Sequence, residues 1–161
     1  MAPFVLELPV RFSDVDHAGI VYYPRFFHWF HLALEELLRA RLGPRAYADL
    51  LDGALLGGPR IGFPAVHAEA DYRAPLRFGD TALVELAVRR IGGTSITFAH
   101  QVRRAADTAA GRAEELCAVG TVVCAVVDLR VFQAAAVPDV LRELLEELHE
   151  TAPAGSSATA R

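Results

Sequence analysis

The sequence predicts an α+β fold in which a curved antiparallel sheet of about five strands wraps around a long central helix. The segment from Pro24 to about Leu42 has helical periodicity, and its first half is apolar around most of its circumference, as is typical of a buried helix. Most of the remaining chain reads as strands, and Gly92-Gly93 forms a tight hairpin turn between two of them. A sheet folded around the helix would bury both.

The first third of the chain is expected to hold one strand and two helices. Residues 4–12 alternate between apolar and polar side chains, which predicts a half-buried strand, and Pro9 places this strand at an edge or a bulge. Pro24 suits the first position of the helix that follows, because an N–H at that position has no partner within the helix and proline has none to leave unpaired. A shorter helix is expected within residues 45–56.

Later segments read as consecutive strands, at residues 66–73, 82–89, 96–102 and 116–127. The last of them is almost wholly apolar, which predicts cover on both faces and therefore a partner sheet or subunit. A final helix begins near Pro138. We expect a single domain over residues 1–150 and a disordered tail at 151–161, which is small, polar and rich in alanine.

Composition narrows the class of protein. The chain has 161 residues, of which 53% are hydrophobic, so one domain can bury a core without disulfides or metal. A net charge of −4 argues against a nucleic-acid-binding protein, because binding to phosphates needs an excess of positive charge. Cys117 and Cys124 lie seven residues apart in one expected strand, too far to form a disulfide. With no long apolar run and no signal peptide, we expect a cytoplasmic protein without a membrane span.

One segment combines features that suit chemistry: Phe12-Ser13-Asp14-Val15-Asp16-His17-Ala18-Gly19-Ile20-Val21-Tyr22-Tyr23-Pro24. Its two carboxylates have an ordinary interpretation as turn residues that bond nearby amides. The alternative interpretation is catalytic, because the carboxylates precede a helix whose start favours negative charge. An Asp there could act as a nucleophile or as a general base, with the helix start stabilising an oxyanion.

This segment resembles the signature of the 4-hydroxybenzoyl-CoA thioesterase family, in its form Asp-x-Asp-x-Ala-Gly-Ile-Val-x-Tyr-Pro. The resemblance covers roughly residues 5–135 and implies the hot-dog fold, in which a sheet wraps a central helix. It implies an acyl-CoA thioesterase that releases a carboxylic acid and coenzyme A without a metal or another cofactor. It also implies a homo-oligomer, a dimer of dimers, with active sites at the subunit boundaries.

Residue roles follow from the same resemblance. Asp16 matches the catalytic carboxylate, and Tyr23 matches the residue whose backbone N–H binds the thioester oxygen. Gly19 would let the backbone approach the acyl group. Trp29 and Phe30 would suit a bulky or aromatic acyl group, although such rings are more often core residues. Asp14 matches a motif position without an assigned chemical role.

His31 departs from the family pattern. It stands where the 4-hydroxybenzoyl enzyme has an Asp that holds the ring hydroxyl. We therefore expect His31 to contact the substrate, and we expect benzoyl-CoA to be hydrolysed at least as well as 4-hydroxybenzoyl-CoA. Two alternatives remain open at this point: a thioesterase acting on an acyl carrier protein in a biosynthetic cluster, and a non-catalytic module that binds acyl-CoA.

Overall fold

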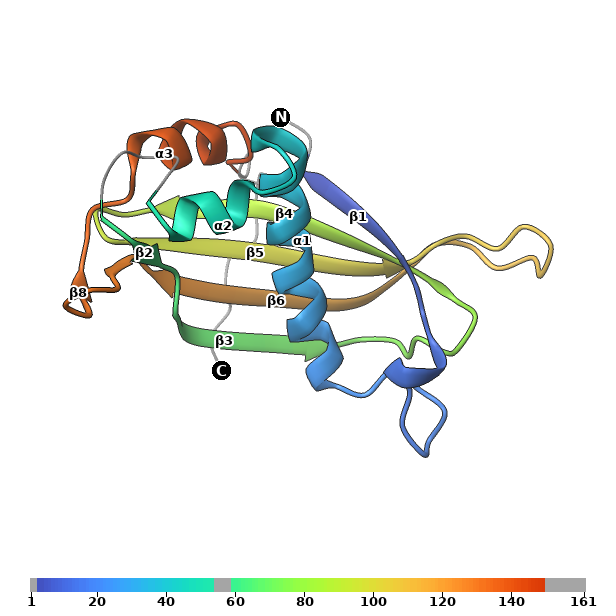
Figure 1. Cartoon of the computed structure of the whole chain (residues 1–161). Coiled ribbons are helices and arrows are strands. Elements are labelled where there is room, and N and C mark those ends of the chain that lie inside the picture. The colour runs from blue at the N-terminus through green and yellow to red at the C-terminus, as the bar shows by residue number, and fades with distance from the viewer. Residues whose placement is uncertain (1–2, 54–58, 150–161) are drawn as a thin grey trace, which may run out of the picture.

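The computed structural model describes residues 3–53 and 59–149. Its main sheet has five antiparallel strands in the order β1-β4-β5-β6-β3 (Figure 1). These strands are β1 (Phe4–Pro9), β3 (Ala65–Tyr72), β4 (Thr81–Ile91), β5 (Ser95–Arg104) and β6 (Glu115–Ala125). The expected α+β class and the antiparallel five-stranded sheet are confirmed. The predicted tail at 151–161 lies outside the described residues.

Helix α1 (Pro24–Leu42) crosses one face of this sheet, which we call the inner face (Figure 1). Strand β4 buries every second side chain in the core beneath the helix, as far as position 88: Ala82, Val84, Leu86 and Val88. The helix contributes buried residues on several sides: Phe26, Trp29, Phe30, Ala33, Leu34, Leu37 and Leu38. Each large apolar side chain that is fully buried here stabilises the fold by about 1.5–3 kcal/mol.

Both ends of α1 follow from local sequence. Tyr23 is the N-cap and Pro24 the first helical residue, as predicted. Gly43 ends the helix with a φ of 109°, a conformation that glycine adopts without a steric penalty. Its N–H donates to the Arg39 carbonyl at 3.0 Å, which satisfies one of the last free carbonyls of the helix.

The outer face of the sheet and one of its edges are less covered than the sequence suggests. Edge strand β3 is exposed at almost every residue, because only β6 pairs with it. On β6, Val119, Thr121 and Val123 are only half-buried on the outer face. Within one chain, therefore, the predicted cover of segment 116–127 exists on the inner face alone.

Several local predictions are wrong. The predicted strand at 4–12 ends at Pro9, and Phe12 lies exposed in the short helix η1 (Phe12–Asp14). Helix α2 (Ala46–Leu51) is shorter than the expected 45–56, part of which lies outside the described residues. A small second sheet went unpredicted, because strands of two residues carry no periodicity: β2 (Ile61–Gly62), β7 (Val127–Asp128) and β8 (Gln133–Ala134).

Two further expectations can be compared with the structure. The predicted last helix is α3 (Asp139–Glu146), which packs beside β4. Cys117 and Cys124 are buried free thiols, so the prediction that they do not pair is confirmed. No helix in the described part of the chain is long and apolar enough to cross a membrane.

Candidate active site

The loop between η1 and α1 closes on itself in a tight turn that begins at Asp16. The Asp16 N–H donates to the Ile20 carbonyl, and the Gly19 N–H donates to the Asp16 carbonyl, both at 2.9 Å. Gly19 has a φ of 74°, which permits this tight return. The Ala18 N–H donates to Asp16 Oδ1 at 2.8 Å and orients the carboxylate. Asp16 itself is exposed, so its other oxygen is available to a ligand.

Asp14, two residues earlier, plays a different part. Its carboxylate is buried, accepts a hydrogen bond from the Arg11 N–H at 2.7 Å, and lies 3.2 Å from Arg25 Nε. The Tyr22 N–H donates to the Asp14 carbonyl at 2.8 Å. Because every contact of Asp14 serves the loop, the structure gives it a positioning role, in line with the absence of a chemical role in the motif.

The start of α1 leaves one backbone donor unused. Arg25 N–H donates to the Tyr22 carbonyl and Phe26 N–H to the Tyr23 carbonyl, while Pro24 has no N–H. No acceptor among residues 3–53 and 59–149 pairs with the Tyr23 N–H. The Tyr72 hydroxyl donates to the Tyr23 carbonyl at 3.1 Å. A free N–H at the positive end of a helix can stabilise a developing oxyanion.

Asp16 and the start of α1 face the same space. We call it the Asp16 cleft, an open hollow of about 590 Å³ lined by Ser13, Val15, Asp16, Tyr22, Pro24, Arg25 and His28. Arg25 is held by Asp14 and by the Ser13 carbonyl, whereas His28 is exposed. Sequence reasoning missed His28, although its position one helical turn after Pro24 places it on the same side of the helix.

A second cavity lies between α1 and the inner face of the sheet. We call it the inner pocket. It has a volume of about 220 Å³ and is lined by Phe27, Phe30, His31, Leu34, Phe63, Ala65, Ala68, Phe98, His100, Val122 and Cys124. Two predicted substrate residues, Phe30 and His31, belong to this cavity. Burial raises the pKa of the Cys124 thiol to about 11, so this thiol stays protonated and unreactive near neutral pH.

The other predicted residues lie elsewhere. Trp29 is buried against Phe26, with the ring centres 5.4 Å apart, and lines neither cavity. Gly19 lines neither cavity and serves the turn of the Asp16 loop. His31 is at the exposed rim of the inner pocket, where its Nε2 lies 3.0 Å from Glu35 Oε1. Glu35 therefore pairs with His31 and not with Arg39, whose Nη1 lies 3.5 Å from Glu36 Oε1.

His100 on β5 also lines the inner pocket, and the sequence motif gives it no role. It is 4% exposed, and its ring stacks on Phe30 with centres 4.3 Å apart. Burial lowers the pKa of His100 to about 3, opposed in part by the nearby Glu85 carbonyl. Its Nδ1 atom has no hydrogen-bond partner in the described structure. The sequence does contain one sign of this site, because His100 falls among the apolar residues of an alternating strand, in line with Phe98 and Val102.

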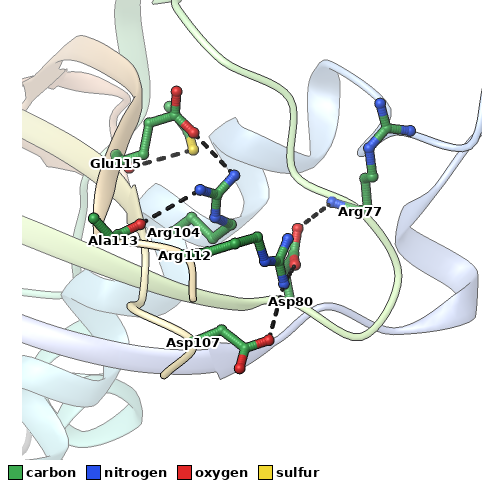
Figure 2. A network of polar contacts seen from close by, with 8 residues as sticks. Arg77, Asp80, Arg104, Asp107, Arg112, Ala113 and Glu115 are labelled. Carbon is green, nitrogen blue, oxygen red and sulfur yellow. Dashed lines mark hydrogen bonds and ion pairs between the residues drawn. The ribbon is translucent and has the colours of Figure 1, made fainter. Parts of the chain in front are cut away.

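A polar network around Asp80 joins the β3–β4 connection to the β5–β6 connection (Figure 2). Buried Asp80 accepts hydrogen bonds from the Arg77 N–H and from the Arg112 guanidinium, both at 2.9 Å. Arg112 also reaches Asp107 Oδ2 at 3.2 Å, which fastens the β5–β6 connection to the same point. The Val21 N–H donates to the Leu76 carbonyl at 2.8 Å. The loop that carries Asp16 is therefore attached to the β3–β4 connection, which this network holds in place.

The two cavities lie on either side of one ridge of α1. Pro24 and His28 line the Asp16 cleft, and Phe27 and His31 line the inner pocket. Residues three or four positions apart on a helix have Cβ atoms about 5–6 Å apart. The chain therefore brings Asp16 and the aromatic lining to neighbouring parts of one helix face, but not into one cavity. In the part of the chain that the structure describes, no group of three His, Cys, Asp or Glu side chains could hold a metal ion.

A carboxylate in a cleft that is also lined by a helix start suits the hydrolysis of activated carbonyl compounds. The sequence pattern of the thioesterase-like superfamily matches residues 10–145. The chain belongs to this superfamily and is a thioester hydrolase.

Individual relatives agree with this assignment. The chain is 34% identical over 146 residues to a 1,4-dihydroxy-2-naphthoyl-CoA hydrolase of Synechococcus sp. (strain CC9605), covering 90% of this chain and 91% of that protein. A solved gentisyl-coenzyme A thioesterase is 26% identical with a TM-score of 0.67, covering 88% and 98% of the two chains. A 1,4-dihydroxy-2-naphthoyl-CoA thioesterase from Synechocystis, 24% identical, shares the fold with a TM-score of 0.73, covering 90% and 96%.

Proposed function

We propose that the protein hydrolyses aryl-CoA thioesters to the free acid and coenzyme A, with 1,4-dihydroxy-2-naphthoyl-CoA as the first candidate substrate. The observation that carries this proposal is the Asp16 carboxylate in the same cleft as the start of α1, where the Tyr23 N–H is free. The names of the Synechococcus relative and of the gentisyl-CoA thioesterase support an aromatic acyl group. The resemblance to the 4-hydroxybenzoyl-CoA family supports it as well.

In the proposed mechanism the thioester oxygen accepts a hydrogen bond from the Tyr23 N–H. The exposed Asp16 oxygen then attacks the thioester carbon, coenzyme A leaves as its thiolate, and water hydrolyses the resulting acyl-aspartyl anhydride. In the alternative route Asp16 takes a proton from water, and that water attacks the carbonyl carbon directly. Both routes build negative charge on the same oxygen, where the N–H and the helix start stabilise it.

The inner pocket supports an acyl group with a ring. Its lining is predominantly apolar and aromatic, and its volume is about 220 Å³. An apolar cavity of about 150 Å³ is enough to bind benzene. The inner pocket therefore has room for a substituted or fused ring.

A panel of purified thioesters tests the proposal through release of free thiol. We expect kcat/KM for 1,4-dihydroxy-2-naphthoyl-CoA, 4-hydroxybenzoyl-CoA and benzoyl-CoA to exceed that for acetyl-CoA, because only a ring fills the pocket. Turnover of aliphatic thioesters alone would contradict the aryl assignment. Preference for the same acyl group on a carrier protein would instead indicate the biosynthetic-cluster alternative, and tight binding without turnover would indicate the non-catalytic module.

We further propose a homo-oligomer, a dimer of dimers, in the cytoplasm. The exposed edge strand β3 and the half-buried outer face of β6 are surfaces that a second copy would cover. The free, buried thiols suit a reducing compartment. Sedimentation equilibrium should give a multiple of the 17.5 kDa chain at micromolar concentration, and a monomer would contradict the assembly.

A further inference from the structure

We propose that His100 determines substrate specificity: the acyl ring enters the inner pocket, and a ring hydroxyl forms a hydrogen bond with His100 Nδ1. This proposal rests on the aryl-CoA hydrolysis proposed above and adds a recognition residue to it. Neither the motif at Asp16 nor any expectation from the sequence assigns a role of this kind to His100.

The first support is an unsatisfied buried atom. His100 is 4% exposed, and its Nδ1 has no partner in the part of the chain that the structure describes. Buried polar groups are nearly always hydrogen-bonded, so an exception at the wall of a cavity points to a ligand that supplies the partner. The neighbours in the pocket are mostly hydrocarbon, including Phe27, Leu34 and Phe98, and offer nothing in its place.

The second support is the fixed orientation of the imidazole. Phe30 stacks on its face with an interplanar angle of 13°, and Phe30 in turn lies against Gly120, which pairs with His100 across the sheet. A ring covered on its face bonds through its edge, because the nitrogen lone pair and the N–H lie in the ring plane. The imidazole is therefore held in one orientation at the wall of the cavity.

The third support is the chemistry of the missing partner. Burial keeps His100 neutral, so Nδ1 carries either a lone pair or an N–H according to the tautomer. A hydroxyl satisfies both, because it can donate and accept. The pocket is also larger than a benzene site, so a hydroxylated aromatic ring matches it in volume, polarity and shape.

The route to the reacting carbon is short. Phe27 and His31, on the rim of the inner pocket, lie one helical turn from Pro24 and His28 in the Asp16 cleft. A flat acyl group that crosses this ridge can leave its thioester on the side of Asp16.

His100 and His31 lead to opposite expectations for the hydroxyl. His31 replaces the family's Asp and is engaged by Glu35, so from His31 alone a bare ring is accepted at least as well as a hydroxylated one. If His100 Nδ1 bonds the substrate, the hydroxylated ring should be preferred, because a ring without the hydroxyl would leave Nδ1 buried without a hydrogen-bond partner. The preference of the wild-type enzyme decides between them.

The experiment compares 1,4-dihydroxy-2-naphthoyl-CoA with 2-naphthoyl-CoA on wild type, His100→Phe and His100→Asn. We expect wild type to prefer the hydroxylated ring, and His100→Phe to lower its kcat/KM about tenfold while nearly sparing the bare ring. His100→Asn keeps a polar side chain and should recover part of the preference. Equal losses on both thioesters, or a wild-type enzyme without preference, would overturn the proposal.

Binding of the free acids, measured by calorimetry, separates this proposal from the proposed function. We expect 1,4-dihydroxy-2-naphthoic acid to bind wild type more tightly than 2-naphthoic acid, even if no aryl-CoA is turned over. Ala68→Phe fills the pocket from strand β3 without replacing His100, and should weaken binding of both acids. Glu69→Phe, on the other face of the same strand, is the matched control. Unchanged binding by Ala68→Phe would show that the ring does not occupy this pocket.

Discussion

The two cavities beside helix α1 are built in different ways. The Asp16 cleft is open, and an exposed loop supplies its carboxylate. The inner pocket borders the hydrophobic core, and Phe30 and Leu34 belong both to the pocket lining and to the core. Substitutions on the loop should change catalysis and leave stability nearly intact. Substitutions in the inner pocket should change stability and substrate choice together, because the same side chains serve both.

The largest expected effect belongs to the loop. Asp16→Asn removes the nucleophile or base and should lower kcat about 100-fold or more. Because Asp16 is exposed, the free energy of unfolding should change by less than about 0.5 kcal/mol. Steady-state kinetics and chemical denaturation measure both quantities. Asp49→Asn, a partly exposed carboxylate on α2, is the control, and near wild-type kcat in the Asp16 variant would remove this residue from the mechanism.

At the inner pocket, Gly120→Ala should change both the stability of the protein and its choice of substrate. An added Cβ would lie 2.5 Å from Phe30 Cε2 and 3.1 Å from the Glu69 carbonyl oxygen, so the ring must move. Such overpacking costs about 1–3 kcal/mol, and a displaced Phe30 should lower aryl-CoA turnover relative to acetyl-CoA. Gly93→Ala meets no heavy atom within 4 Å and is the control. Unchanged stability and aryl preference would mean that the pocket is not coupled to the core.

The inner pocket should also make stability depend on pH. The pKa of His100 falls from 6.5 to about 3 on folding, so the unfolded chain binds the proton first as the pH drops. The contribution to stability is complete above pH 6.5 and is lost as the pH falls towards 3. From pH 7 to pH 5 the loss is about 2 kcal/mol. Denaturation at both pH values should show a smaller loss in His100→Phe, and equal losses would contradict a buried neutral His100.

The smallest effect sharpens the contrast within the loop itself. Asp14→Asn weakens the contact with Arg25 and the hydrogen bond from the Arg11 N–H, which should cost about 1 kcal/mol of stability. The kcat should fall much less than in Asp16→Asn, because Asp14 faces the protein. If the Asp14 variant lost activity as completely while remaining folded, the division of roles between the two carboxylates would be wrong.

The fold was predictable wherever the hydrophobic periodicity of a helix or strand extends over several turns or residues. Helix α1 begins and ends at the predicted residues, because Pro24, the apolar stripes and Gly43 all agree. The strands from β3 to β6 also lie close to their predicted positions. The two-residue strands were out of reach, since pairing in them depends on distant segments rather than on local pattern.

The site was predictable only in part. The motif indicates Asp16 and Tyr23; Asp16 lines the cleft, and Tyr23 is the N-cap of α1, between the lining residues Tyr22 and Pro24. His100 was missed because its isolation depends on sheet register and on the ring above it, neither of which is local in sequence. Trp29 and Phe30 look alike in a helical pattern, yet Trp29 packs in the core. Phe30 reaches the pocket because Gly120 leaves room for its ring.

That last contact ties together three positions far apart in the chain. Phe30 occupies the space of the side chain that Gly120 lacks, and it lies flat on His100. No one of the three can change size freely while the others stay fixed. Across related sequences, positions 30, 100 and 120 should therefore covary. A chain that gains a side chain at position 120 should carry a smaller residue at position 30, and with it a differently shaped space for the substrate.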